Sequence, residues 1–168
     1  MASGGYKGLR IYQEGHRLAV EVHRMSLKLP KFEMYEEGGQ IRRSSKSVPT
    51  NIVEGYGRRP YKNDYLRFLV YAHASCGETR EHLELLHDCQ SLDSTGFQKL
   101  LSAYDALGRQ IFYFADSVAK EHVSPGQYRN EANAPTVKES SAVYEPLDPD
   151  FVKWLEDERR GDEGETER

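Results

Sequence analysis

A cluster of cationic side chains between residues 40 and 62 is the main chemical feature of this chain of 168 residues. Its members are Arg42, Arg43, Lys46, Arg58, Arg59 and Lys62. Glu54 is the one acidic residue in the same stretch. Guanidinium and ammonium groups bind phosphate oxygens without reading base sequence. The cluster therefore indicates either a phosphate-binding surface or a set of solvated side chains and intersubunit ion pairs.

A second set of cations precedes this cluster at regular spacing. Arg10, Arg17 and Arg24 recur every seven residues, and a heptad spacing drifts by only about 20° per step around a helix. They therefore form a stripe on one helix face. The candidate phosphate-binding residues are Arg17, Arg24, Arg42, Arg43, Lys46, Arg58 and Arg59. Because no recognition-helix or RNA-platform motif accompanies them, we expect RNA or DNA to be bound without sequence specificity.

The net charge of −4 is unevenly distributed along the chain. Residues 7–62 hold 12 basic and 6 acidic side chains, whereas residues 124–168 hold 6 basic and 12 acidic side chains. A basic first part and an acidic end are typical of a protein with a charged partner surface and a solvated tail.

The sequence offers no constellation typical of an enzyme. Glu84 and His87 form one Glu-x-x-His pair, whereas a di-iron bundle requires two. Cys-x-x-Cys and His-Glu-x-x-His are absent, and the two cysteines read as reduced thiols. No apolar run approaches the roughly 20 residues that cross a bilayer. We therefore expect a non-enzymatic cytoplasmic protein with no cofactor, no metal and no membrane contact.

Apolar side chains recur at helical spacing over four segments. These segments cover residues 9–29, 39–57, 62–90 and 94–122, with Asp93 or Ser94 as a cap before the last. Residues 31–38 read as a connection. Short connections between long amphipathic helices favour antiparallel neighbours. We therefore predict an all-α protein, with an N-terminal leader at 1–8 and an antiparallel up-down four-helix bundle at 9–123.

The second predicted helix contains Pro49, which costs one backbone hydrogen bond and about 3 kcal/mol unless packing compensates. We expect the hydroxyl groups of three serines to bond the carbonyl groups that the proline frees, notably that of Ser45. The serines are Ser44, Ser45 and Ser47. Gln40, Asn51 and Glu54 read as polar groups that hold the bundle together.

Residues 124–168 change in character. Four prolines lie among Ser, Asn and Glu residues, which reads as a linker. A short amphipathic helix is predicted near 149–159, with Phe151, Trp154 and Leu155 on one face. This segment folds back onto the bundle, docks on a partner, or is an inert part of the tail. The second possibility makes the protein an interaction scaffold, which is the alternative to nucleic-acid binding.

The stretch from 40 to 55 closely resembles the signature of the 23S rRNA intervening-sequence protein family. The family pattern is Gln-Leu-Arg-Arg-Ala-x-x-Ser-Ile/Val-Pro-x-Asn-Ile-Ala-Glu-Gly. The matching residues here are Gln40, Arg42, Arg43, Ser47, Val48, Pro49, Asn51, Ile52, Glu54 and Gly55. Val53 replaces the usual alanine. Further similarity extends from residue 6 to about 122, and the tail falls outside it.

What this resemblance implies is a small bacterial four-helix bundle that assembles as a ring-like homo-oligomer, commonly a pentamer. Relatives include accessory proteins of diversity-generating retroelements, which pair with a reverse transcriptase and bind nucleic acid through basic surfaces. We therefore expect a homo-oligomeric accessory protein that binds nucleic acid, with a reverse transcriptase or another protein as a possible partner.

Overall fold

The computed structural model describes residues 5–121, and within that range it contains helices and no β-strand. A 3₁₀ helix at Tyr6–Gly8 precedes α1 (Arg10–Ser26), α2 (Lys31–Tyr35), α3 (Glu37–Gly57), α4 (Lys62–Asp88) and α5 (Ser94–Glu121). The four predicted helices are confirmed, with bounds within three residues of those expected. The expected connection at 31–38 instead holds the short helix α2 and the first residues of α3. The predicted tail helix lies outside the described residues.

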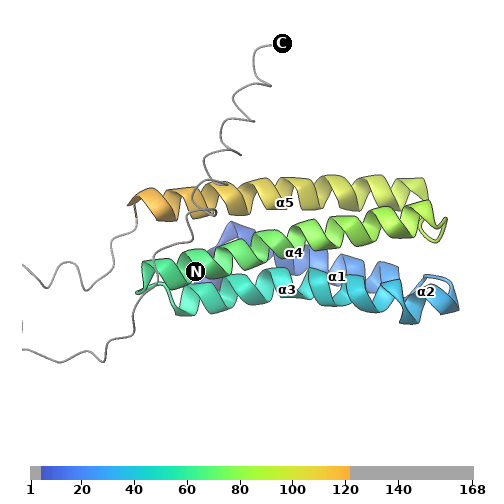
Figure 1. Ribbon diagram of the computed structural model, residues 1–168, viewed down its shortest axis with the longest axis horizontal. Helices are drawn as coiled ribbons and strands as arrows, with labels where there is room; N and C mark the ends of the chain where they lie inside the picture. The colour runs from blue at the N-terminus through green and yellow to red at the C-terminus, as the bar shows by residue number, and fades with distance from the viewer. Residues whose placement is uncertain (1–4, 122–168) are drawn as a thin grey trace, which may run out of the picture. The chain divides into compact units, whose positions relative to one another are not determined.

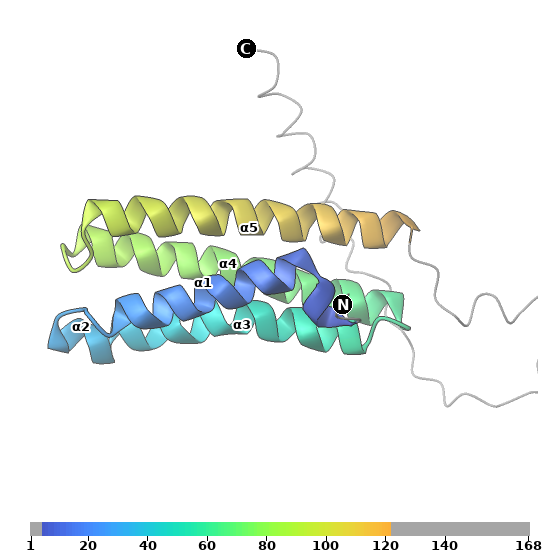
Figure 2. The ribbon, with the colours of Figure 1, turned by 180° about the vertical axis from the view of Figure 1, so that it is seen from behind.

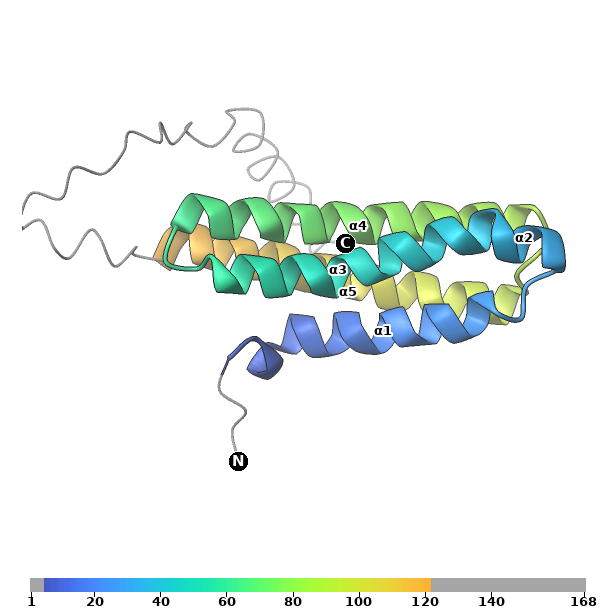
Figure 3. The same ribbon diagram turned by 90° about the horizontal axis from the view of Figure 1, so that it is seen from below.

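The four long helices lie side by side, and each runs antiparallel to the long helix before it (Figures 1 and 3). Helix α3 packs extensively on both α1 and α4, and α4 packs on α5. The contact between α1 and α5 is smaller. The short α2 lies at the end of the bundle where α1 gives way to α3 (Figure 2). The all-α bundle architecture predicted from apolar periodicity is therefore confirmed for one chain.

The core consists of the apolar positions that the helical spacing selects. Side chains from all four long helices are fully buried there, namely Leu18, Val22, Ile41, Val48, Ile52, Leu66, Leu69, Leu83, Leu86, Tyr104, Leu107 and Ile111. Burial of one Leu, Ile or Val side chain stabilises a fold by about 1.5–3 kcal/mol. This core fixes the rotation of each helix and thereby determines which polar side chains point outward.

Helix α3 continues through Pro49 without a break. The proline is buried beside Gly15 of α1, where a Cβ atom would lie 3.8 Å from the Cβ of Pro49 and 3.4 Å from Val48. These are ordinary van der Waals distances, so the proline packs directly against α1 at this point. Packing of the buried proline ring offsets part of the cost of a proline within a helix.

Candidate nucleic-acid interface

The candidate phosphate-binding cations fall into engaged and unengaged groups. Arg42 belongs to the first group because its side chain is half-buried. Its Nη1 donates to Ser26 Oγ at 3.0 Å, and its Nη2 donates to the Met34 carbonyl oxygen at 3.0 Å. Arg42 therefore ties α3 to the end of α1 and to α2. These two bonds give Arg42 a structural role, and its role as a phosphate contact stays a prediction.

Arg17 is engaged by carboxylates of its own helix. It pairs with Glu14 at 2.6 Å and with Glu21 at 2.9 Å. The hydrogen bond from Arg17 lowers the pKa of Glu14. For Glu21, the hydrogen bond from Lys99 of α5 is the main cause of a lowered pKa. The expected stripe of Arg10, Arg17 and Arg24 is thus interrupted by a neutralised residue.

Arg58 and Arg59 are exposed at the end of α3 but already have partners. Arg58 lies 3.6 Å from Glu54 and 3.7 Å from Asp64. Arg59 stacks over the ring of Tyr56, 4.2 Å from its centroid, and donates to the Tyr56 carbonyl oxygen. Surface contacts of this kind contribute little stability. Neither of these two cations lines the groove described next.

The remaining three cations, Arg24, Arg43 and Lys46, are exposed, and within residues 5–121 none of them forms an ion pair. Arg24 and Lys46 flank a groove of about 460 Å³ between α1 and α3. Its other lining residues are His16, Ala19, Val20, His23, Pro49 and Thr50. None of the described lining residues is acidic. The groove thus combines an apolar floor with positive charge.

His23 adds a second observation at the groove. Its Nδ1 atom is buried and has no hydrogen-bond partner among the described residues. Buried polar atoms in folded proteins are nearly always paired. His23 thus places a buried, unpaired nitrogen in a residue that lines the groove.

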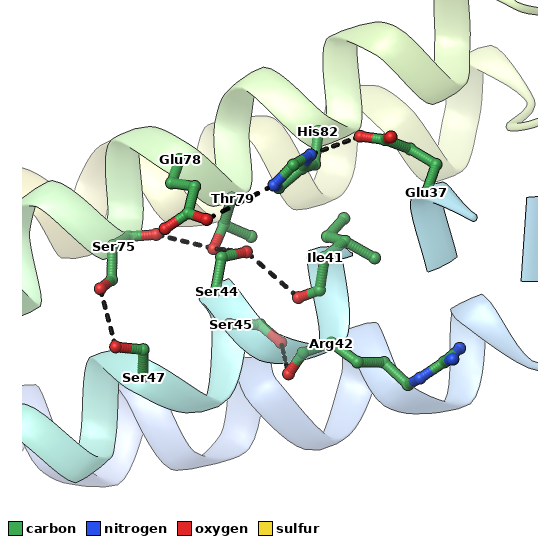
Figure 4. Close-up of polar contacts among 10 residues, drawn as sticks. All are labelled: Glu37, Ile41, Arg42, Ser44, Ser45, Ser47, Ser75, Glu78, Thr79 and His82. Atoms are coloured by element: carbon green, nitrogen blue, oxygen red, sulfur yellow. Dashed lines mark hydrogen bonds and ion pairs between the residues drawn. The ribbon is translucent and has the colours of Figure 1, made fainter. Parts of the chain in front are cut away.

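The opposite side of α3 carries a row of hydroxyl groups that joins it to α4, which we call the polar seam (Figure 4). Ser75 Oγ donates to Ser47 Oγ at 3.0 Å, and Thr79 Oγ1 lies 2.9 Å from Ser44 Oγ. Further along, His82 Nδ1 contacts the carboxylate of Glu37. The polar seam is a structural element, and it accounts for the small polar residues of the signature that face α4.

The serines bond carbonyl groups other than the expected one. Ser44 Oγ donates to the carbonyl oxygen of Ile41, and Ser45 Oγ donates to that of Arg42, as Figure 4 shows. The expectation that they satisfy the Ser45 carbonyl is therefore corrected. A serine hydroxyl in a helix reaches a carbonyl group three or four residues earlier in the chain. Ser44 and Ser45 therefore bond carbonyl groups that precede the Ser45 carbonyl, which is the one that Pro49 leaves free.

The other signature residues differ in role. Gln40 and Glu54 are exposed, so within one chain they do not tie helices together as expected. Asn51 is half-buried and donates to the Ser47 carbonyl oxygen at 2.9 Å and to Ser47 Oγ at 2.9 Å, so it supports the polar seam. Gly55 marks a close approach of α3 to α4, because a Cβ atom there would lie 2.9 Å from the Cβ of Phe68.

Phe151, Trp154 and Leu155 lie outside the described residues. Within residues 5–121, no group of three or more His, Cys, Asp or Glu side chains is arranged to hold a metal ion. In the same range, no helix combines the length and apolarity needed to span a membrane.

The fold and the signature define a class of small four-helix bundles. The family model described as 23S rRNA-intervening sequence protein matches residues 7–113. The chain therefore belongs to this family, as its signature predicts.

One solved structure with a similar fold is a protein of unknown function from the S23 ribosomal protein family of Bacteroides thetaiotaomicron. It is 18% identical, with a TM-score of 0.58, over 63% of this chain and 95% of that chain. At this identity the likeness shows the fold alone. No curated protein is significantly similar to the chain.

Proposed function

We propose that this protein is a non-enzymatic accessory that binds nucleic acid through the outer face of α1 and α3. The observation that carries the proposal is the groove flanked by Arg24 and Lys46, whose described lining includes no acidic residue. Arg43 is one helical turn before Lys46 and is also exposed. We call these three residues, Arg24, Arg43 and Lys46, the cationic triad.

The charge of the α1–α3 face, and not the net charge of the whole chain, supports this proposal. Several other cations of the described bundle pair with carboxylates, as in the pairs Arg17–Glu14 and Lys120–Asp116. Cations that are not neutralised by a carboxylate attract a polyanion over the screening length, which is roughly 10 Å at 0.1 M salt. The cationic triad therefore adds positive charge to the α1–α3 face, although the chain is acidic overall.

The size of the effect follows from counterion release. Each neutralised phosphate contributes about 0.7 to the slope of log affinity against log salt for a single strand. Three contacts give a slope of about −2, which corresponds to a roughly 15- to 20-fold loss of affinity between about 50 and 200 mM salt. A binding curve measured across a salt series resolves a difference of this size.

The test is fluorescence anisotropy of a labelled RNA or DNA oligonucleotide with the full chain across that salt series. The test variant replaces Arg24, Arg43 and Lys46 by Gln. A matched control replaces three exposed cations of α4 and α5, Arg67, Arg109 and Lys120, by Gln, with the same change of net charge. We expect the test variant to lose affinity and most of the salt slope, and the control to keep both. Equal loss in both variants, or no binding by the wild type at low salt, contradicts the proposal.

We also propose that the bundle acts as a ring of five chains and that it works beside a reverse transcriptase. Two aromatic side chains on α2, Phe32 and Tyr35, are 75% and 79% exposed in the single chain, which supports an assembling surface. Light scattering of the full chain should give five times 19.3 kDa, about 97 kDa. A monomer would contradict the ring. Co-purification tests the second part: absence of a reverse transcriptase from the complexes isolated from the native cell contradicts that partner.

A further inference from the structure

A group of aromatic rings continues the groove toward the N-terminal end of α1. The ring of Tyr12 lies 5.8 Å from that of His16, which lines the groove. Tyr6 packs edge-on against Tyr12 at 4.9 Å and against Tyr56 at 6.4 Å. We call Tyr6, Tyr12 and Tyr56 the tyrosine cluster. The 3₁₀ helix places it where the start of α1 meets the end of α3.

The tyrosine cluster lies outside the hydrophobic core. All three rings are only half-buried, unlike Tyr104, which is fully buried. Arg59 stacks on one of the rings, 4.2 Å from the centroid of Tyr56. Two exposed cations, Lys7 and Arg10, come from the segment that carries Tyr6 and Tyr12. Partly exposed aromatic rings beside arginine and lysine are the elements with which proteins hold unpaired nucleobases.

The geometry therefore points to a single-stranded ligand, and this inference rests on the proposed function. We propose that the cationic triad holds the phosphates of one strand and that the tyrosine cluster stacks one or two of its unpaired bases. Twelve residues of α1 separate Tyr12 from Arg24, which is about 18 Å of helix.

A duplex does not satisfy both parts of this surface. Bases in a duplex are paired and stacked on one another, so their faces do not reach a protein ring without unstacking. A single strand offers every base face, and stacking on an aromatic ring tolerates all four bases. The tyrosine cluster thus favours single-stranded over duplex nucleic acid and does not select a base sequence.

The experiment compares one oligonucleotide as a single strand and as a duplex of the same length. Wild-type full chain should bind the single strand at least about tenfold more tightly. Tyr12→Leu and Tyr56→Leu should each weaken single-strand binding by roughly 5- to 150-fold. Both should leave the duplex affinity and the salt slope unchanged. Tyr12→Phe keeps the ring and should bind as the wild type does.

The matched control is Tyr71→Leu combined with Tyr113→Leu, since both tyrosines are exposed on α4 and α5. This variant should bind as the wild type does. Circular dichroism checks the helix content of every variant. Ultraviolet crosslinking of the wild type gives a readout without substitution, with adducts expected on Tyr12 or Tyr56.

The outcomes separate this inference from the proposed function. Equal affinity for both strand states, unchanged binding by the two leucine variants, or adducts only on other residues would overturn the single-strand inference, while phosphate binding by the cationic triad would stand. Failure of the wild type to bind either oligonucleotide would overturn both.

Discussion

Arg42 and Arg43 are neighbours in the signature, and the structure predicts opposite effects of replacing them. Arg42→Ala removes two hydrogen bonds from a charged group, to Ser26 Oγ and to the Met34 carbonyl oxygen. Such bonds contribute about 1.5–3 kcal/mol each, and the partial exposure of Arg42 places them at the lower end. We therefore expect the free energy of unfolding to fall by about 2–4 kcal/mol. Arg43 is exposed, so Arg43→Ala should change it by no more than about 0.5 kcal/mol.

Urea denaturation followed by far-ultraviolet circular dichroism measures both effects at one protein concentration. With a slope of about 2 kcal/mol per molar urea, the midpoint of Arg42→Ala should fall by about 1–2 M, and that of Arg43→Ala should not move. Oligonucleotide anisotropy should show the reverse pattern, with a salt slope reduced by about 0.7 only in Arg43→Ala. A stable Arg42→Ala protein that has lost nucleic-acid binding would refute the assignment of Arg42 as a structural contact.

Three further predictions concern the bundle itself. Gly55→Ala overpacks the α3–α4 contact and should lower the free energy of unfolding by about 1–3 kcal/mol. Gly77→Ala is the control, because position 77 has open space, and it should raise the free energy of unfolding by about 0.5–1 kcal/mol. Equal midpoints of the two variants in urea denaturation contradict this. Burial raises the pKa of Cys76 to about 12, so a thiol reagent at neutral pH should modify the exposed Cys89 and reach Cys76 only after unfolding; two fast thiols would argue against it. The hydrogen bond from Lys99 of α5 lowers the pKa of Glu21, so the Glu21–Lys99 ion pair stabilises the bundle above about pH 4.5 and is lost as the pH falls. The free energy of unfolding measured from pH 6 to 3 should therefore decline less in Glu21→Gln than in the wild type. Identical pH profiles would exclude the effect.

The helices were predictable because their apolar residues follow one period over many turns. Leu18 and Val22 of α1, like Leu83 and Leu86 of α4, are buried as the spacing requires. The short helix α2 was not predictable in this way, because none of its five residues is buried. It follows Pro30, and its exposed Phe32 and Tyr35 give no apolar period.

The roles of individual polar residues were less predictable than the fold. Spacing places Arg42 and Arg43 on α3, but only the tertiary structure brings the Met34 carbonyl group to Arg42. The same holds for the polar seam, where Thr79 of α4 meets Ser44 from 35 residues away. Glu54 faces solvent because the core fixes the rotation of α3. Sequence alone identified the cationic region but not which of its members remain unpaired.

The most direct test of the account is an experimental structure of the full protein bound to an oligonucleotide. The account predicts phosphate groups within hydrogen-bonding distance of Arg24 and Lys46, along the groove between α1 and α3. Phosphates bound on α4 and α5, or a groove filled by carboxylate groups of a neighbouring subunit, would contradict it.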